Sequence, residues 1–375
     1  MKPLIIVDYS HTVMRMVFVA IAQAKPKKKQ GKFITSEYMP YMKYLLFNSL
    51  QFVKNKFNGD MVLAIDSKMN WRRDLYSDYK ANRAKAKTDS GIDFDEFFGE
   101  VDKITDVIRE MFPFKVVKVP KSEADDIAGT ISLVYGNDRT IVLVTSDHDW
   151  SQVLSHTNTQ MWDPIKKEFA NLTDFENTII ETDFGNMSRF TIIHSLIGDK
   201  GDNVPTITGM TEFSDAFKSY LKENNIVNTS VKDFNSMGIK DELIENFNVY
   251  KITKSGANKG KQTEEKDVYK TVPFGIKKAE KAAENVDSLN GLLNSHPMYR
   301  DNFIRNRTLV DFDCVPENIK RDILDEFERV EINYDPNKML EYFMQENLGQ
   351  HINNIHKFHD TSLEKQTSTS LDDFF

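Results

Sequence analysis

Three short apolar segments of this sequence each run into an aspartate. Residues 4–7 lead into Asp8, residues 62–65 into Asp66, and residues 141–144 are followed closely by Asp147 and Asp149. These segments have the length and β-branched content of strands buried on both faces, as in a parallel sheet. Ligands of open α/β sheets bind beyond the carboxyl ends of the strands, so the sequence predicts that these acids line one crevice.

Further acids join this set. Glu123, Asp125 and Asp126 open a predicted helix, and Asp199 and Asp202 follow another in Gly-Asp-Lys-Gly-Asp-Asn. So many carboxylates can share a small volume only if hard cations neutralise them, and oxygen ligands suit Mg²⁺ or Mn²⁺. Two such ions about 3.5–4 Å apart would generate a hydroxide and stabilise both oxygens of an in-line phosphoryl displacement. The candidate metal ligands are Asp8, Asp66, Glu123, Asp125, Asp126, Asp147, Asp149, Asp199 and Asp202.

Each of these acids also has an ordinary structural interpretation. Ser122-x-x-Asp125 has the pattern of a capping box, and acids in the first turn of a helix complement its dipole. Asp126 and Asp202 are the members most easily explained in this way. The strand-end placement of the whole set favours the metal site, and His148 is expected to face away from it.

The order of predicted elements indicates an α/β fold with a central twisted, mostly parallel sheet in residues 1–198. Residues 199–350 are predicted to form a helical region with an insertion at 206–272, and residues 361–375 a disordered tail. Helices are expected at about 38–56, 99–111, 123–135, 187–197, 210–222, 240–247, 276–286, 316–329 and 336–346.

The composition is that of an ordinary globular chain of 375 residues with room for two domains. A single cysteine, Cys314, excludes an intramolecular disulfide and a cysteine-based zinc site, and it suits a reducing cytoplasm. Neither a signal peptide nor a membrane span is expected. The net charge of −8 does not exclude a nucleic-acid partner, because the acids concentrate in the candidate metal site.

Basic residues cluster between Trp71 and Lys87. On helical spacing, one face carries Arg72, Tyr76, Lys80, Arg83 and Lys87, with Arg73 and Tyr79 beside it. Such a face can bind phosphates and stack bases, or it can be a solvated helix whose tyrosines pack inward. The basic segment starts only a few residues after Asp66, so its cationic face is expected to lie over the candidate metal site. This proximity favours substrate binding.

Two other basic segments are candidates for phosphate contact. Lys25, Lys27, Lys28, Lys29 and Lys32 form a basic loop, for which a localisation signal or a solvated loop are the alternatives. Residues 274–281 indicate a glycine turn that leads into a basic helix start, where backbone N–H groups can hold a phosphate.

These motifs occur in an order that resembles the 5′ nuclease (flap endonuclease) family, and most closely its ribonuclease H-type members from T-even-type bacteriophages. The resemblance is carried by Asp8, Asp66, Arg72-Arg73, Tyr79-Lys80-x-x-Arg83, Glu123-Ala-Asp-Asp126, Thr145-Ser-Asp-His-Asp149 and Gly198-Asp-Lys-Gly-Asp-Asn-Val-Pro205. It spans residues 4 to about 205 and continues more weakly to about residue 345.

The resemblance implies a structure-specific nuclease that uses two Mg²⁺ ions, with Mn²⁺ as a substitute. It implies 5′→3′ exonuclease, flap endonuclease and ribonuclease H-type activity that removes RNA primers and 5′ flaps during phage lagging-strand replication, in the cytoplasm of the infected host. Asp8, Asp66, Glu123, Asp125, Asp147 and Asp149 would hold the metals directly or through water, and Asp199 and Asp202 would complete the second site. Lys80 and Arg83, in a helical arch at about 70–98, would be the catalytic contacts to the scissile phosphate, and Arg72, Arg73, Tyr76, Tyr79 and Lys87 would bind nucleic acid.

The sequence departs from the family after Pro205, where relatives continue into a Gly-Ile-Gly hairpin that grips duplex phosphates. Here Thr206-Ile-Thr-Gly-Met210 follows, so we predict that Gly275, Lys277 and Lys278 anchor the duplex instead. Whether a monovalent cation binds at that turn stays open.

The C-terminus is similar to sliding-clamp-binding peptides through Leu371, Phe374 and Phe375, although such a tail can also dock on its own domain. The implied partners are branched or nicked DNA, RNA–DNA duplexes with a 5′ end, the sliding clamp and a single-stranded-DNA-binding protein, with the chain as a monomer.

Two alternative functions compete with this prediction. One is a metal-dependent ribonuclease of the related PIN class, which lacks a long basic arch and a helical C-terminal half. The other is a catalytically inactive, clamp-tethered flap-binding protein, against which the complete acidic set argues.

Overall fold

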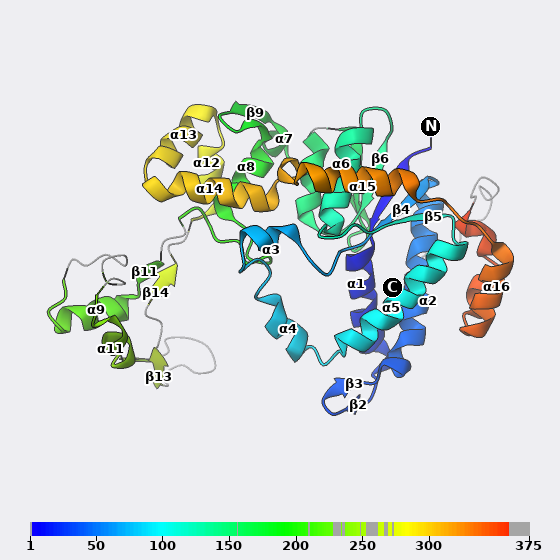
Figure 1. Ribbon diagram of the computed structural model, residues 1–375, viewed down its shortest axis with the longest axis horizontal. Coiled ribbons are helices and arrows are strands. Elements are labelled where there is room, and N and C mark those ends of the chain that lie inside the picture. The colour runs from blue at the N-terminus through cyan, green and yellow to red at the C-terminus, as the bar shows by residue number, and fades with distance from the viewer. Residues whose placement is uncertain are drawn as a thin grey trace. The chain divides into compact units, whose positions relative to one another are not determined.

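The computed structural model describes residues 2–155, 157–208, 211–227, 234, 237–247, 249–252, 262–265, 269–271 and 274–359 (Figure 1). The predicted tail at 361–375, with Leu371, Phe374 and Phe375, lies outside these residues. Part of the predicted insertion at 206–272 lies outside them as well.

A six-stranded sheet organises the N-terminal half, in the order β5-β4-β1-β6-β7-β8. The first five strands in this order run parallel, and β8 pairs antiparallel with β7. The strands are β1 (Leu4–Asp8), β4 (Asp60–Ala64), β5 (Phe114–Val117), β6 (Ile141–Val144), β7 (Thr159–Asp163) and β8 (Glu168–Ala170). The predicted mostly parallel α/β fold is therefore confirmed.

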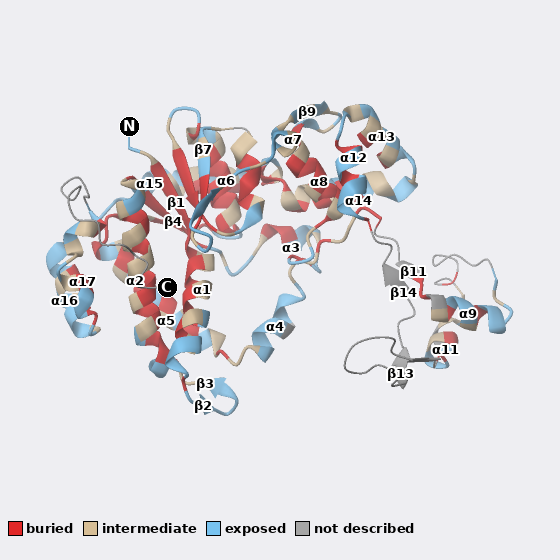
Figure 2. Ribbon diagram, turned by 180° about the vertical axis from the view of Figure 1, so that it is seen from behind, coloured by how far each residue is buried: buried red, intermediate tan, exposed pale blue. Residues whose placement is uncertain are grey.

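Alternate residues of the strands are buried on opposite faces of the sheet. Ile5 and Val7 pack with the helices α1 (Tyr9–Ala24), α2 (Thr35–Phe57) and α5 (Phe94–Met111). Leu4 and Ile6 pack on the other side with α6 (Ala124–Tyr135) and α15 (Glu317–Arg329). The burial view shows both cores beside the strands (Figure 2). This double coverage explains why the strand segments are apolar throughout.

The remaining elements agree with the predicted pattern in part. Helix α1 begins directly after Asp8 and was not among the predicted helices. The segment predicted as one helix at 187–197 divides into a strand, β10 (Gly185–Ser188), and a helix, α8 (Arg189–Ile197). The other elements are β2 (Lys28–Lys29), β3 (Lys32–Phe33), α3 (Trp71–Leu75), α4 (Arg83–Asp89), η1 (His148–Ser155), α7 (Asp174–Asn177), β9 (Ile179–Thr182), β11 (Thr211–Phe213), α9 (Asp215–Glu223), α11 (Lys240–Glu245), β12 (Val249–Ile252), β13 (Gln262–Glu265), β14 (Tyr269–Thr271), α12 (Ile276–Ala282), α13 (Val286–Asn294), α14 (Pro297–Val310), η2 (Phe312–Cys314), α16 (Pro336–Gln345), α17 (Gly349–Ile352) and η3 (Ile355–Phe358).

The chain divides into two compact units, and the division does not follow the predicted boundary at residue 198. The first unit comprises Met1–His194, Asp199–Val204 and Arg307–Phe375, and the second Ser195–Gly198 and Pro205–Asn306. The C-terminal segment joins the first unit because Ile319 and Ile323 of α15 lie in the core beneath the sheet. In the second unit, Phe213, Phe217 and Phe247 belong to a separate apolar cluster. No helix in the described part of the chain is long and apolar enough to cross a bilayer.

Two helical glycines allow a matched test of the packing. A Cβ added at Gly129 in α6 would lie 2.5 Å from a ring carbon of Phe312, whereas one added at Gly99 in α5 would meet nothing within 4 Å. We expect Gly129→Ala to lower the free energy of unfolding by roughly 1–3 kcal/mol through overpacking. Gly99→Ala should raise it by about 0.5–1 kcal/mol through helix propensity. Urea denaturation measures both, and stabilisation by Gly129→Ala would contradict the packing described.

Candidate metal centre and arch

The strand-end aspartates are held by local hydrogen bonds. The Asp8 carboxylate caps α1, where it accepts from the backbone N–H of His11 at 2.9 Å, and it also accepts from the Thr145 hydroxyl at 3.1 Å. The Asp66 carboxylate accepts from the backbone N–H of Ala124, at the start of α6, at 2.7 Å. Strand β1 and the end of β4 therefore present their acids at the edge where α6 begins.

The carboxylates near β6 and the following loops are oriented in a similar way. Asp147 accepts from the backbone N–H of Asp149 at 3.0 Å, and Asp125 accepts from the indole N–H of Trp150 at 2.7 Å. Asp199 accepts from the backbone N–H of Gly201 at 2.7 Å. A carboxylate oxygen that accepts one hydrogen bond keeps a lone pair, so these groups can still bind a cation.

Burial and mutual repulsion together raise the pKa values of several of these acids. Burial first, and then the charges of Asp66 and Asp147, raise the pKa of Asp8 to about 7. Burial and the charges of Asp147, Asp199 and Asp202 raise the pKa of Asp149 to about 8.

The same two causes act on other members of the set. Burial, with like charges nearby, raises the pKa of Asp66, of Asp125 and of Asp199. The neighbours that raise the pKa of Asp125 are Asp147, Glu123 and Asp66. The predicted ligands therefore lie within electrostatic range of one another, as one acidic cluster.

Glu123 differs because cations surround it. Burial would raise its pKa, but Lys80 and Arg72 outweigh burial and lower that pKa to about 2. The ammonium of Lys80 forms an ion pair with Glu123 and lies 3.3 Å from Asp202. The phenolic oxygen of Tyr79 lies 2.9 Å from Glu123 and 2.7 Å from Asp202. Side chains of the predicted arch thus neutralise one wall of the acidic cluster.

Asp126 has a structural position in this arrangement. It is fully buried, and its carboxylate accepts from the backbone N–H of Glu123 at 2.9 Å and from the indole of Trp71 at 3.1 Å. The capping box of α6 is therefore formed by Glu123 and Asp126, one residue away from the Ser122–Asp125 pair suggested by the sequence. A guanidinium nitrogen of Arg72 lies 2.8 Å from Asp126. These partners explain Asp126 without a metal.

The basic segment after Asp66 is not the continuous helix that its spacing suggested. Helix α3 ends at Leu75, α4 starts at Arg83, and Lys80 between them has a left-handed backbone with φ of 56°. The backbone N–H of Lys80 donates to the carbonyl of Asp202 at 2.8 Å. Arg72, Tyr76, Lys80, Arg83 and Lys87 therefore do not share one helical face.

The predicted nucleic-acid-binding residues differ in how far they are buried. Arg72 and Tyr79 are buried, and the Arg72 guanidinium also donates to the carbonyl of Leu309 at 2.7 Å. Tyr76 is partly buried against Tyr79, while Arg73 and Lys87 are exposed. Arg83 is half-exposed and forms an ion pair with Asp202. Gly275, Lys277 and Lys278 are exposed at the start of α12 in the second unit.

Sequence reasoning missed two side chains beside the acids. The Nδ1 atom of His194 lies 3.5 Å from a carboxylate oxygen of Asp149, and burial, with His148 nearby, lowers the pKa of His194 to about 4. His194 lies on α8, which leads into the Gly198-Asp199 motif, and that position was the available signal. Trp150 was missed because an indole near two aspartates has no distinctive spacing.

The donor set fits hard divalent cations. Among the described residues, no three acidic, histidine or cysteine side chains are arranged as a ready metal site. The buried carboxylates with raised pKa values nevertheless supply only oxygen donors and an excess of negative charge, which Mg²⁺ or Mn²⁺ would relieve. Six of the nine candidate ligands have no lysine or arginine bonded to them among the described residues. They are Asp8, Asp66, Asp125, Asp147, Asp149 and Asp199.

Comparison with known families gives two matches. Residues 3–185 match the 5′-3′ exonuclease N-terminal resolvase-like domain, and residues 276–358 match the C-terminal domain of T4 RNase H. The chain therefore belongs to the 5′ nuclease family, with a C-terminal region of the T4 RNase H type. Neither family model covers residues 186–275.

The individual relatives are distant. Ribonuclease H of Enterobacteria phage T4 is 24% identical over 326 residues, which cover 84% of this chain and 86% of the relative. DNA polymerase I of Streptococcus pneumoniae is 27% identical over 215 residues, or 56% of this chain and only 23% of the polymerase. A solved structure of T5 5′-exonuclease with bound zinc ions is 18% identical, with a TM-score of 0.46, and the match covers 88% of this chain and 99% of that one.

The raised pKa values predict how metal binding stabilises the fold. For Asp8 and Asp149 the folded-state pKa lies above the unfolded value, so stability from these groups is present at low pH and is lost as pH rises from about 4 through about 7 and 8. Because Mg²⁺ replaces these protons, its effect on the melting temperature should be larger at pH 8 than at pH 5.5. Thermal melts with Mg²⁺ or chelator, at matched ionic strength, measure this difference.

Asp8→Asn is the informative variant for this prediction. The amide retains a cap for α1 but removes one charge, so without metal it should melt at or above the wild-type temperature at pH 8. Its gain from Mg²⁺ should be smaller. An equal Mg²⁺ effect at both pH values, or an unchanged effect in Asp8→Asn, would contradict the assignment.

Proposed function

We propose that this protein is a structure-specific, Mg²⁺-dependent 5′ nuclease with 5′→3′ exonuclease and flap endonuclease activity. The observation that carries the proposal is the convergence of eight carboxylates, from Asp8 to Asp202, beside the cationic side chains of Lys80 and Arg83. An acidic cluster alone suits a cation. The adjoining cations give a reason for a polyanionic substrate at the same place.

The carboxylates divide by their surroundings. Asp8, Asp66, Asp125, Asp147 and Asp149 would hold divalent ions directly or through water, Glu123 would join them once released from Lys80, and Asp199 and Asp202 would complete a second site. When bound, two Mg²⁺ ions, or Mn²⁺ in their place, would supply a nucleophilic hydroxide and stabilise the leaving oxygen of a phosphodiester.

The arch residues would act on the substrate phosphate. Lys80 and Arg83 are ion-paired with Glu123 and Asp202, at the edge of the acidic cluster. Burial would lower the pKa of Lys80, but Glu123 and Asp202 outweigh it and raise that pKa above its ordinary value, so the side chain is a cation at neutral pH. A scissile phosphate at the metals would offer both cations a new anionic partner. The exposed Arg73 and Lys87 would contact the nucleic acid further out, whereas Arg72, Tyr76 and Tyr79 would support the arch from within.

The substrates we propose are RNA–DNA duplexes, nicks and 5′ flaps of phage lagging-strand replication, in the cytoplasm of an infected cell. The names of two relatives, ribonuclease H and DNA polymerase I, support this choice. Gly275, Lys277 and Lys278 would anchor the duplex. Leu371, Phe374 and Phe375 would bind a sliding clamp, and a single-stranded-DNA-binding protein would be a further partner.

One cleavage assay tests the central proposal. We expect a 5′-flap substrate to be cut with Mg²⁺ and not with chelator, and the double variant Asp8→Asn with Asp147→Asn to cut at least 10²-fold more slowly, on the order expected for loss of a main electrostatic group. The control is Asp138→Asn with Asp322→Asn, two exposed acids elsewhere in the first unit. Metal-independent cleavage would refute the mechanism, and binding without cleavage would favour the inactive flap-binding alternative.

Lys80→Ala separates catalysis from docking. Because Lys80 lies within the acidic cluster, its loss should lower kcat on the order of 10²-fold and leave the Kd for duplex within about threefold. Lys87→Ala, which removes an exposed charge of α4, should leave kcat close to the wild-type value. Single-turnover cleavage and a binding titration give the two quantities, and equal losses in both would make Lys80 a docking residue.

A further inference from the structure

A histidine side chain approaches the acidic cluster from helix α8. The Nδ1 atom of His194 lies 3.5 Å from a carboxylate oxygen of Asp149, and 22% of the His194 side chain is exposed. This separation is longer than that of an ordinary N–H···O hydrogen bond, which is about 2.7–3.2 Å. The two side chains therefore face each other without the close contact that a hydrogen bond between them would give.

The orientation of the His194 ring is fixed by its neighbours. The ring stacks on Phe190, with centroids 4.3 Å apart and planes at 28°. The ring of His148 lies edge-on to it at a centroid distance of 6.2 Å, and the Nδ1 atom of His148 is 3.1 Å from the Ser151 hydroxyl. Packing of this kind locks a side-chain conformation, so less entropy is lost when the side chain binds a ligand. The nitrogen of His194 is therefore positioned beside Asp149 in advance.

A further oxygen donor comes from the same segment of the chain. Asp199 follows α8 in the Gly198-Asp199 turn, and its charge acts on Asp149. Within the described part of the chain, no lysine or arginine is bonded to Asp149 or Asp199. Helix α8 and the turn after it thus bring one nitrogen donor and one oxygen donor to the part of the cluster that the arch cations do not neutralise.

The type of donor atom decides which ion a position prefers. Mg²⁺ is a hard cation that takes oxygen ligands, whereas an imidazole nitrogen suits first-row transition ions. Two ligand atoms about 2.1 Å from one ion lie about 3.0 Å apart at an octahedral angle and about 3.4 Å apart at a tetrahedral one. The 3.5 Å between Nδ1 of His194 and the Asp149 oxygen is close to this range. A small side-chain movement is therefore enough for both atoms to bind one ion.

We propose that His194 is a metal ligand, which together with Asp149 and Asp199 forms a mixed nitrogen–oxygen position that binds Mn²⁺ or Co²⁺ more tightly than Mg²⁺. The proposal rests on the proposed function, because that function supplies the need for divalent ions at this cluster. It also makes the two metal positions unequal. The carboxylates of Asp8 and Asp66 offer oxygen alone and suit Mg²⁺, whereas the position beside α8 has one ligand that Mg²⁺ does not favour.

Pulsed electron paramagnetic resonance of bound Mn²⁺ tests the assignment without any turnover. The probe is Mn²⁺ alone, added to the full-length protein in substoichiometric amount so that the tighter position fills first. We expect the electron spin echo to be modulated by a directly bound nitrogen. Labelling the histidines with ¹⁵N should move this modulation to the ¹⁵N frequency, which identifies the ligand as a histidine in the unaltered chain. A wild-type spectrum without nitrogen modulation would overturn the proposal.

The variant His194→Gln identifies which histidine is the ligand. The nitrogen modulation should disappear, and the Kd for Mn²⁺ should rise by about tenfold or more, as is typical when the environment of a metal ligand is disturbed. The Kd for Mg²⁺ should stay within about threefold of the wild-type value, because Mg²⁺ gains little from a nitrogen ligand. Calorimetric titrations without substrate give both constants, and circular dichroism in chelator checks the fold. Equal losses for the two ions would make His194 a positioning residue for Asp149 and overturn its assignment as a ligand.

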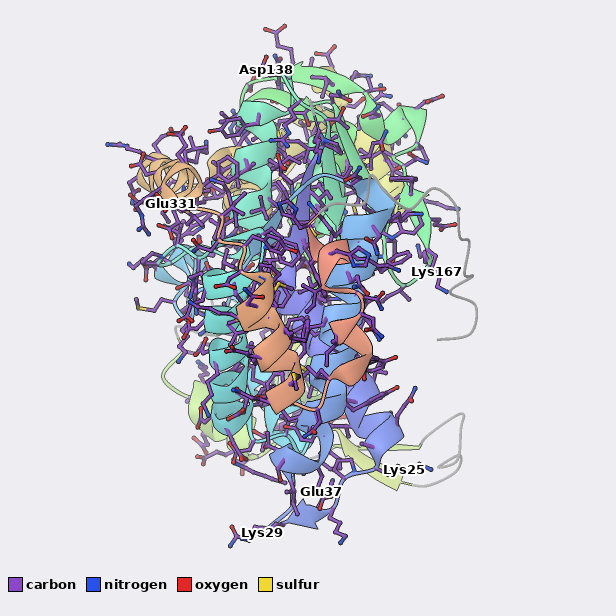
Figure 3. The ribbon with its side chains drawn as sticks, turned by 90° about the vertical axis from the view of Figure 1, so that its right-hand side faces the viewer. Lys25, Lys29, Glu37, Asp138, Lys167 and Glu331 are labelled. Carbon is purple, nitrogen blue, oxygen red and sulfur yellow. The ribbon has the colours of Figure 1, made fainter. Side chains whose placement is uncertain are left out.

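Two control variants accompany this one. His148→Gln changes the ring beside His194 and should keep both the nitrogen modulation and the Mn²⁺ affinity. Modulation that is lost in His148→Gln and kept in His194→Gln would assign the nitrogen to the other ring and overturn the proposal. Asp138→Asn removes an exposed acid, labelled at the surface of the first unit in Figure 3, and should leave the Kd of both ions unchanged.

Failure of the nuclease proposal is seen separately. If the wild-type protein shows the nitrogen modulation but cuts no 5′ flap with either Mg²⁺ or Mn²⁺, the proposed function fails and the metal position stands. If it cuts the flap and shows no nitrogen modulation, only the role of His194 as a ligand is refuted.

Discussion

Mutual repulsion among buried carboxylates is the constraint on which the rest of this structure depends. Parallel strands end at a common edge, and here that edge receives Asp8, Asp66 and Asp147 together with the acids that open α6. The fold gains nothing in stability from bringing such groups together. Part of the repulsion is offset by protons on Asp8 and Asp149 and by the cations of the arch. Bound divalent ions would offset the rest.

The arch is consequently part of the electrostatic balance of the site. Arg72 is buried between Glu123 and Asp126, and a buried guanidinium requires such partners. Lys80 and Arg83 neutralise Glu123 and Asp202 from the other side. The segment thus remains attached to the acids at its near end while α4 stays in solvent. Binding of a metal or of a phosphate would compete for the same ion pairs.

Much of the sheet and the acidic cluster could be predicted from the sequence, because both follow from local patterns. Apolar segments of strand length ending in Asp8, Asp66 and Asp147 specify buried parallel strands and the edge where their acids meet. The inward orientation of Arg72 and Tyr79 could not be predicted. Their helical spacing was clear, but the partners that bury them, Leu309 and Asp202, are more than a hundred residues away in sequence. The left-handed backbone at Lys80, which ends the helical repeat, depends on the same distant loop.

Similar reasoning explains the other differences. Helix α1 follows its strand without a connecting loop, so no turn residues separated the two in the sequence. Helix α15 packs against the sheet although it lies far from the strands in sequence. Its amphipathic spacing predicts a buried face but not which element covers that face. The sequence suggested that Asp125 caps α6 together with Ser122, whereas the capping box is formed by Glu123 and Asp126, because the helix starts one residue later than the pattern suggested.

The single hydrogen of the Tyr79 hydroxyl limits how many hydrogen bonds it can donate. It lies within bonding distance of Glu123 and Asp202, yet a phenol has one hydrogen to give. Burial and the neighbouring carboxylates raise the pKa of Tyr79, so that hydrogen stays on the ring oxygen. The phenol can therefore donate to only one of the two acids at a time, and the other acid keeps its cationic partners, which are Arg72 and Lys80 for Glu123 and Lys80 and Arg83 for Asp202. The hydrogen bond of Tyr79 can therefore switch between Glu123 and Asp202 without any movement of the backbone.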